Sequence, residues 1–188
     1  MTRVVPSNEA PWRDLKSIVI GANCHGGRCF CQRFKIAEKQ WRSVDDAGRG
    51  RRLRAQAQAG CGLVAYIDDE AVGWARVEPR SAYATLGQTP WRGRKERRDD
   101  DTVWAAACFI VRAGFRGQGI TYDLARAAVD FARDRGARAL EGYPMDPEPG
   151  KDVQWGELHV GKRTIFDAAG FVEVARPSLR RVVMWIDF

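Results

Sequence analysis

The sequence predicts an α/β domain with a central, mixed and mostly antiparallel sheet of about six or seven strands flanked by helices. Two observations predict this class. Apolar runs of strand length are joined by short polar turns, which is typical of antiparallel hairpins. Residues 102–143 read as a strand, a helix and a second strand, and strands connected in this way run parallel. At 188 residues and 21.1 kDa, the chain has the size of one domain, spanning 1–188.

The first sixty residues contain one expected strand and two expected helices. Residues 15–21 form a β-branched run that ends in glycine, which favours a strand, and a Gly- and Cys-rich loop follows. Residues 35–59 are mostly helix formers. Because Gly48 and Gly50 interrupt them, we expect two helices with the break at these glycines.

The middle of the chain supplies the central strands. Residues 63–67 and 71–77 are apolar runs around an acidic turn, which predicts a hairpin. Residues 79–101 are polar and without periodicity, so we expect an exposed loop. Residues 102–111, TVWAAACFIV, are continuously apolar and predict a strand that is buried on both faces.

The C-terminal half completes the expected parallel pair. Leu124, Ala128 and Phe131 recur at helical spacing in residues 121–135, and Gly136 is a typical helix end. Residues 137–143 return as a strand. A short helix is expected over residues 162–169, ended by Gly170, and residues 171–175 and 181–185 predict a closing hairpin.

The net charge is +7, with much of the excess in two Arg-rich stretches at residues 49–54 and 92–98. Such runs are either solvated surface or a face for an anionic partner such as tRNA, an acidic protein or a phosphorylated cofactor. No run of about 18 apolar residues and no apolar signal core occurs, so we expect a cytoplasmic protein without a membrane span.

The five cysteines do not predict a metal centre. Cys24, His25, Cys29 and Cys31 lie close together, but their spacing matches no standard zinc framework, and no second cysteine pair follows at the right distance. Cys61 and Cys108 fall in apolar runs, where reduced thiols pack as small hydrophobes. No metal is therefore expected.

The turn GFRGQGIT at residues 114–121 is the main candidate for a binding site. It is rich in glycine and joins the buried strand to the start of its helix. Backbone N–H groups at a helix start have no partner within the helix and favour an anion, and glycines let the backbone approach phosphate oxygens closely. A phosphate-binding P-loop needs a Lys that is missing here. A dinucleotide fingerprint needs glycine or alanine where Tyr122 stands.

The pattern R-x-x-G-x-T, with Arg116, Gly119 and Thr121, instead resembles the Q/R-x-x-G-x-G/A motif of the GNAT acetyltransferases. The order of elements after Cys61 and the AAGF segment at residues 168–171 are also similar to that family. The resemblance implies a sheet splayed at its parallel pair and acetyl-CoA as co-substrate.

By this resemblance two segments would bind the cofactor. The strand end would pair with the pantetheine arm, and the turn would hold the diphosphate, mainly through backbone N–H groups. The residues concerned are Phe109, Ile110 and Val111 in the strand and Arg116, Gly117, Gln118, Gly119, Ile120 and Thr121 in the turn. Phe166 stands beside the cofactor where many members have a Tyr that protonates the CoA thiolate, and phenylalanine cannot donate that proton.

The base that would deprotonate the amine is less clearly marked. Glu141 is the first candidate and Glu78 the second, because both are carboxylates near strand ends. Tyr143 and His159 follow. The alternative interpretation is that each carboxylate is a solvated residue at a strand end without a catalytic role.

Three functions remain open at this point. The first is an N-acetyltransferase acting on a primary amine of a small molecule. The second acts on a protein or aminoacyl-tRNA amine, guided by the Arg-rich stretches. The third is a CoA-binding module without catalysis, which Phe166 and the lack of a carboxylate in the central strand favour. A homodimer is compatible with all three.

Overall fold

A computed structural model describes residues 1–23, 29–86, 97, 99–147, 153 and 155–188, and its centre is a seven-stranded sheet. The strand order is β1-β2-β3-β4-β5-β7-β6, and every neighbouring pair is antiparallel except β4 and β5. The strands are β1 Arg3–Pro6, β2 Gly62–Ile67, β3 Glu70–Pro79, β4 Val103–Val111, β5 Ala139–Gly142, β6 Val172–Ser178 and β7 Arg181–Asp187. The mixed, mostly antiparallel sheet is confirmed.

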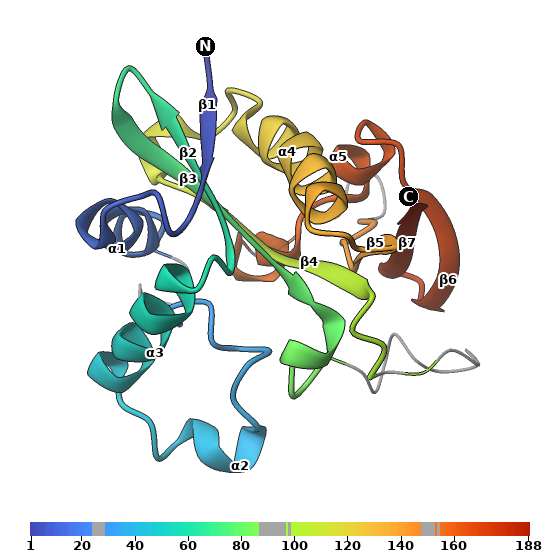
Figure 1. Ribbon diagram of the computed structural model, residues 1–188, viewed down its shortest axis with the longest axis horizontal. Coiled ribbons are helices and arrows are strands. Elements are labelled where there is room, and N and C mark those ends of the chain that lie inside the picture. The colour runs from blue at the N-terminus through green and yellow to red at the C-terminus, as the bar shows by residue number, and fades with distance from the viewer. Residues whose placement is uncertain (24–28, 87–96, 98, 148–152, 154) are drawn as a thin grey trace.

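Helices cover both faces of this sheet (Figure 1). α4 and α5 pack on one face, and α1 and α3 pack on the other. The helices are α1 Trp12–Gly21, α2 Glu38–Trp41, α3 Asp46–Gln58, α4 Ile120–Asp134 and α5 Arg163–Asp167, with short 3-10 turns at η2 Arg80–Ala82, η3 Ala113–Phe115 and η4 Trp155–Val160. Leu124, Ala128 and Phe131 of α4 are buried against β2, β3 and β4, as their spacing predicts.

The expectation of a strand at residues 15–21 is wrong, because this segment forms most of α1. Leu15, Ile18 and Val19 are buried, whereas Ile20 is half exposed, so the apolar residues form a helical stripe. Pro11 immediately precedes the helix, at a position where its missing N–H is not needed. The first strand is instead Arg3–Pro6, which pairs with β2.

The two helices expected in residues 35–59 exist, but the predicted position of the break between them is wrong. Gly48 and Gly50 lie inside α3, and the break falls at residues 42–45. The Asp45 carboxylate accepts the Gly48 N–H at 2.7 Å and so caps the helix upstream of both glycines. Gly50 packs beside the Phe30 ring, and a Cβ there would make an ordinary contact with it at 3.4 Å.

The splayed parallel pair is confirmed by the register of β4. Its first four residues pair with β5, from Val103 opposite Ala139 to Ala106 opposite Gly142. β5 ends there, while β4 continues to Val111 paired with β3 alone. A bulge in the β3–β4 ladder leaves Ala107 without an opposite residue, because Arg76 pairs with Cys108 and Val77 with Ala106.

The predicted hairpins at 63–77 and 171–185 are confirmed, as are the strand 137–143 and the short helix before Gly170, each with somewhat different bounds. Of the expected loop 79–101, residues 87–96 and 98 lie outside the described residues. No described helix is long and apolar enough to cross a membrane.

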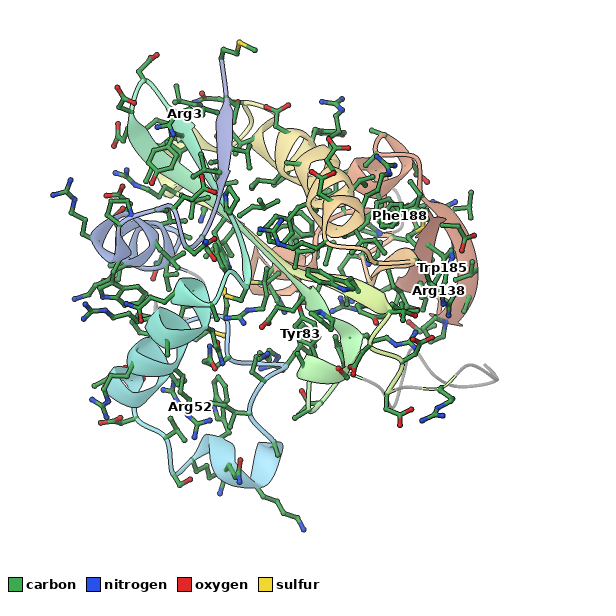
Figure 2. The ribbon with its side chains drawn as sticks, viewed as in Figure 1. Arg3, Arg52, Tyr83, Arg138, Trp185 and Phe188 are labelled. Carbon is green, nitrogen blue, oxygen red and sulfur yellow. The ribbon has the colours of Figure 1, made fainter. Side chains whose placement is uncertain are left out.

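The first Arg-rich stretch lies on α3, where Arg51, Arg52 and Arg54 are exposed and Arg52 extends from the helix in Figure 2. Arg49 instead turns inward, donates to the Val44 carbonyl and stacks on Trp41. The second stretch, 92–98, lies outside the described residues apart from Arg97.

Candidate functional site

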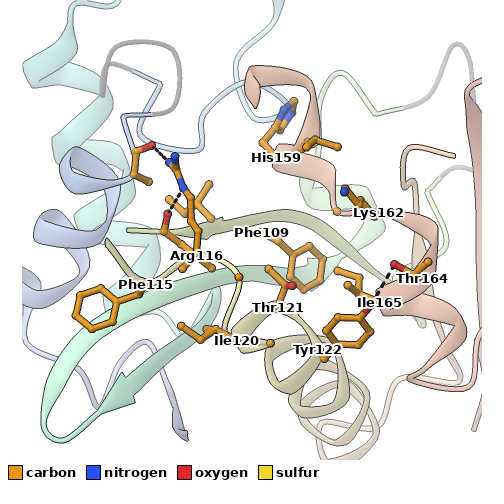
Figure 3. A pocket seen from close by; sticks show the side chains of 17 residues that line it. Phe109, Phe115, Arg116, Ile120, Thr121, Tyr122, His159, Lys162, Thr164 and Ile165 are labelled. Atoms are coloured by element: carbon orange, nitrogen blue, oxygen red, sulfur yellow. Dashed lines mark hydrogen bonds between the residues drawn. The ribbon is translucent and has the colours of Figure 1, made fainter. Parts of the chain in front are cut away.

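A cavity of about 350 Å³ lies where the sheet splays, between the end of β4, the start of α4 and the start of α5 (Figure 3). Four segments line it: the end of α1, the end of β4, the glycine turn with the first residues of α4, and η4 with the start of α5. The lining residues are Ala22, Phe109, Ile110, Val111, Phe115, Arg116, Gly117, Gly119, Ile120, Thr121, Tyr122, Leu158, His159, Gly161, Lys162, Thr164 and Ile165.

The glycine turn has a backbone conformation that side chains disfavour. Gly117 and Gly119 have φ angles of +77° and +80°, and Gly119 is the N-cap of α4. A Cβ added to either glycine would meet no atom within 4 Å. Glycine is therefore required by the backbone, and the space above the turn is open.

Backbone N–H groups of this turn are available to a ligand. The amides of Tyr122 and Asp123 donate to the Gly119 carbonyl at 2.8 and 3.4 Å. The amides of residues 117–121 have no main-chain acceptor within the described part of the chain. They stand at the positive end of a 15-residue helix, where unpaired N–H groups and the helix dipole favour an anion such as a phosphate.

Phe109, Ile110 and Val111 line the cavity from the part of β4 beyond β5. On one side these residues pair with β3, and on the other side no strand adjoins them in the described sheet. An extended, amide-containing ligand arm could therefore bind along this edge as a further strand would.

The Arg116 side chain folds back onto the protein. Its Nε donates to the Val111 carbonyl at 3.3 Å, and its Nη2 donates to the Ala22 carbonyl (Figure 3). The guanidinium thus joins the turn to the end of β4 and the end of α1. Its positive charge stays beside the turn, and a direct bond to a phosphate remains a prediction.

All but two of the residues predicted to bind the cofactor line the cavity. Gln118 is exposed and lies outside the lining. Phe166 is fully buried, with its ring edge-on to Phe109 at 5.5 Å and to Phe171 at 5.1 Å. It therefore supports the cavity wall from behind.

On the far wall of the cavity, which η4 and α5 provide, sequence reasoning singled out His159 as a candidate base and missed the other lining residues. The Tyr122 hydroxyl lies 3.3 Å from Thr164 Oγ1 and links the starts of α4 and α5. Lys162 lines the cavity, and no acidic side chain in the described chain pairs with it. Apart from His159, the only sequence signal for this wall was the short helix itself, since the segment before it has no periodicity.

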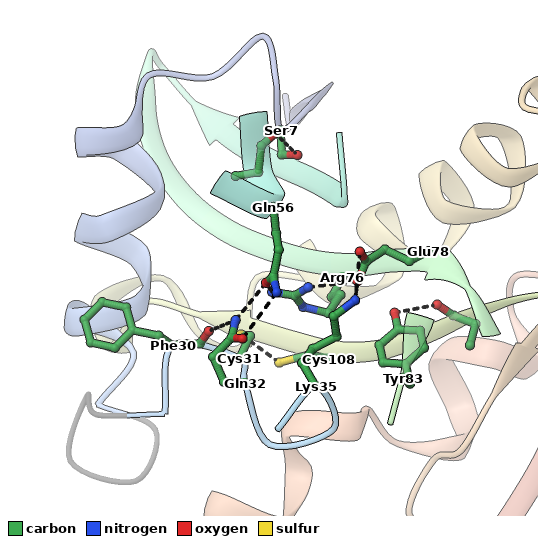
Figure 4. A network of polar contacts seen from close by, with 12 residues as sticks. Ser7, Phe30, Cys31, Gln32, Lys35, Gln56, Arg76, Glu78, Tyr83 and Cys108 are labelled. Atoms are coloured by element: carbon green, nitrogen blue, oxygen red, sulfur yellow. Dashed lines mark hydrogen bonds and ion pairs between the residues drawn. The ribbon is translucent and has the colours of Figure 1, made fainter. Parts of the chain in front are cut away.

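Both predicted carboxylates are held in ion pairs away from the cavity lining. Glu141 is completely buried, accepts from Arg80 Nη1 at 3.0 Å and accepts the Tyr143 hydroxyl at 3.0 Å. Glu78 accepts from Lys35 Nζ at 3.0 Å and from Arg76 Nη1 at 2.8 Å, as Figure 4 shows.

Among the residues proposed as a base, His159 is the one that lines the cavity. It belongs to η4, and its ring stacks on Phe34 with centroids 5.8 Å apart. Phe34 in turn packs against the buried cluster of Tyr83, Ala105 and Tyr143 on the other side of β4. His159 therefore stands between the cavity and this second cluster.

Metal chemistry finds no support in the described residues, where no three His, Cys, Asp or Glu side chains are grouped closely enough to hold an ion. Cys24 and His25 of the cysteine-rich loop lie outside the described residues.

Several solved structures share this fold at low sequence identity. The chain aligns with yncA from Salmonella typhimurium, solved with its cofactor acetyl-CoA, at a TM-score of 0.59 and 15% identity, covering 99% of this chain and 93% of that one. It aligns with ribosomal-protein-alanine N-acetyltransferase from Brucella melitensis at 0.57 and 16%, covering 99% of both chains. The aminoglycoside acetyltransferase AAC(6')-Ib in complex with coenzyme A gives 0.55 and 17%, with 100% and 95% covered.

A comparison with curated proteins found no match. The sequence model of the Acetyltransferase (GNAT) family matches residues 31–144, which is more than half of the chain and includes β2 to β5 and the glycine turn. The chain therefore belongs to the GNAT family of acetyltransferases.

Proposed function

We propose that the protein transfers an acetyl group, or a similar acyl group, from acyl-CoA to a primary amine by direct attack in a ternary complex. The observation that carries this proposal is the open glycine turn at the start of α4, whose backbone amides face a cavity bounded by the free edge of β4. A cofactor with a diphosphate and an amide-containing arm needs both features side by side.

In this proposal, the amides of Gly117, Gln118, Gly119, Ile120 and Thr121 bind the diphosphate. The backbone of Phe109, Ile110 and Val111 binds the pantetheine arm. Lys162, on the opposite wall, adds a positive charge to a cavity that would receive an anionic ligand. Phe166 acts indirectly, by packing behind Phe109.

Acetyl transfer requires a neutral amine and a leaving thiolate. A thiol with a pKa of about 8.5 leaves readily as the thiolate, so the chemistry does not require an acid at Phe166. For the proton of the amine we place His159 ahead of Glu141 and Glu78, because His159 lines the cavity and histidine is the side chain that most often serves as a general base. The two carboxylates would act only after leaving their ion pairs.

A small-molecule amine is the first acceptor we propose. Acetylation of a protein or tRNA-linked amine is the second, and the exposed Arg51, Arg52 and Arg54 on α3 favour it, because an anionic partner would be attracted there. Activity that falls steeply with added salt would distinguish the second acceptor class from the first.

The test is an assay of the purified protein with acetyl-CoA and a panel of amines: small polyamines, amino acids, aminoglycosides and lysine-containing peptides. Mass spectrometry of the amines measures the acetylated product, because reagents that detect the released CoA thiol would also react with cysteines of the protein. An acetylated amine supports the proposal. Binding of acetyl-CoA without any product would instead indicate a catalytically silent CoA-binding module.

A further inference from the structure

Two buried thiols meet on the face of the sheet opposite α4. Cys31 Sγ lies 3.0 Å from Cys108 Sγ, although the residues are 77 positions apart in the chain (Figure 4). Cys31 belongs to the loop before α2, and Cys108 lies on β4 immediately before the cavity-lining residues 109–111. A disulfide bond is about 2.05 Å long, so roughly 1 Å of approach would join the two sulfurs.

The surroundings of this pair favour one thiol as a nucleophile. Hydrogen bonding from Cys108 and the nearby charge of Arg76 lower the pKa of Cys31, against the opposing effect of burial. Cys61, a third buried thiol near Arg76, behaves differently, because burial raises its pKa to about 11. Cys29 also has a raised pKa, from burial and from its neighbour Cys31.

We propose that Cys31 and Cys108 form a redox-active dithiol that a peroxide converts reversibly into a disulfide. The Cys31 thiolate attacks one oxygen of hydrogen peroxide, so that an S–O bond forms, the O–O bond breaks and water leaves after protonation. The Cys108 thiolate then attacks the Cys31 sulfur, an S–S bond forms and a second water leaves. Two thiols and one peroxide thus give one disulfide and two waters.

The bond would clamp the loop at residues 29–36 onto β4. Within this loop Gln32 already bonds the Gln56 side chain and the Phe30 carbonyl, and Phe34 stacks on His159 of the cavity wall. Neither Cys31 nor Cys108 lines the cavity itself. The disulfide therefore fixes a support of the cavity wall without occupying the site. This inference does not depend on the proposed transferase activity.

The positions of the tryptic cleavage sites allow the bond to be mapped directly. Trypsin releases Cys29 and Cys31 on the peptide 29–33, Cys108 on 99–112 and Cys61 on 55–76. After treatment with hydrogen peroxide, we expect the mass of the intact protein to fall by about two units. The remaining thiols are then blocked before digestion. Digestion should give a crosslink between peptides 29–33 and 99–112 that dithiothreitol removes.

Three serine variants identify the partners. Cys31→Ser should abolish the crosslink, whereas Cys29→Ser and the matched buried control Cys61→Ser should retain it. In the oxidised wild type, amide hydrogen exchange in residues 29–36 should also slow by at least threefold. A crosslink within 29–33, a crosslink that survives in Cys31→Ser, or an unchanged thiol count in the wild type would each overturn the proposal. The wild-type mapping decides the question even if a variant fails to fold.

Discussion

At the scale of single residues, the proposed cofactor site depends on backbone groups more than on side chains. Gly117 and Gly119 were identifiable from the sequence, because the motif fixes positions where positive φ and an open approach are needed. The roles of Arg116 and Phe166 were not, since a motif gives no side-chain direction. Arg116 turns to two carbonyls, and Phe166 packs behind the wall.

The first prediction concerns His159 as the proton acceptor. We expect His159→Gln to lower kcat/KM about 100-fold, the order of magnitude for loss of a general base, while the affinity for acetyl-CoA stays close to that of the wild type. Steady-state kinetics with the best amine and calorimetry with acetyl-CoA measure the two quantities. A larger loss in Glu78→Gln, with His159→Gln nearly unaffected, would assign the base to the carboxylate instead.

At the scale of elements, the sequence predicted the strands and helices after residue 60 well and those of the first sixty residues poorly. Residues 102–143 were clear because a continuous apolar run, a helical stripe and a glycine end coincide there. Residues 15–21 were misassigned because a short β-branched run fits both a strand and one face of a helix. Only packing against β3 and β4 selects the helix.

The second prediction concerns the packing of α5 against the end of β5. A Cβ on Gly142 would lie 2.1 Å from Cε1 of the buried Phe166 ring, so the ring must move. We expect Gly142→Ala to lower the free energy of unfolding by about 2 kcal/mol, within the usual range for overpacking. Urea unfolding measures it. Gly114→Ala is the matched control, because a Cβ there meets nothing within 4 Å, and an equal loss in both variants would contradict this explanation.

At the scale of the whole molecule, the splay of the sheet creates the site. β5 ends after four paired residues while β4 continues, and the glycine turn, η4 and α5 surround the gap. Local sequence patterns predicted β2 to β7, but neither β1 nor the segment that forms the far wall. Lys162 and Thr164 reach the cavity through tertiary packing between α4 and α5, which no periodicity encodes.

The third prediction concerns acid stability. Hydrogen bonds from Thr102 and Arg138 hold the pKa of Asp100 well below its usual range, and bonds from Arg176 and Arg163 lower the pKa of Asp146. Because these pKa values are lower in the folded protein, their stabilisation is complete above about pH 5 and is lost as the pH falls further. The free energy of unfolding should therefore decrease from pH 5 to pH 3.

Urea unfolding at several pH values measures this dependence. Asp100→Asn, which cannot ionise, should be less stable at pH 5 and show a shallower decrease toward pH 3. An equally steep decrease in the variant would show that Asp100 contributes nothing to it.

The central claim is that the glycine turn at the start of α4 binds the diphosphate of CoA, and calorimetry with acetyl-CoA tests it most directly. Gly119→Trp fills the open space above the turn, and Gly136→Trp is its control at the other end of α4, with a similar positive φ and equally open surroundings. We predict binding by the wild type and by Gly136→Trp, and at least a 100-fold weaker affinity for folded Gly119→Trp. Equal affinity in all three proteins, or no binding by the wild type, would contradict the claim.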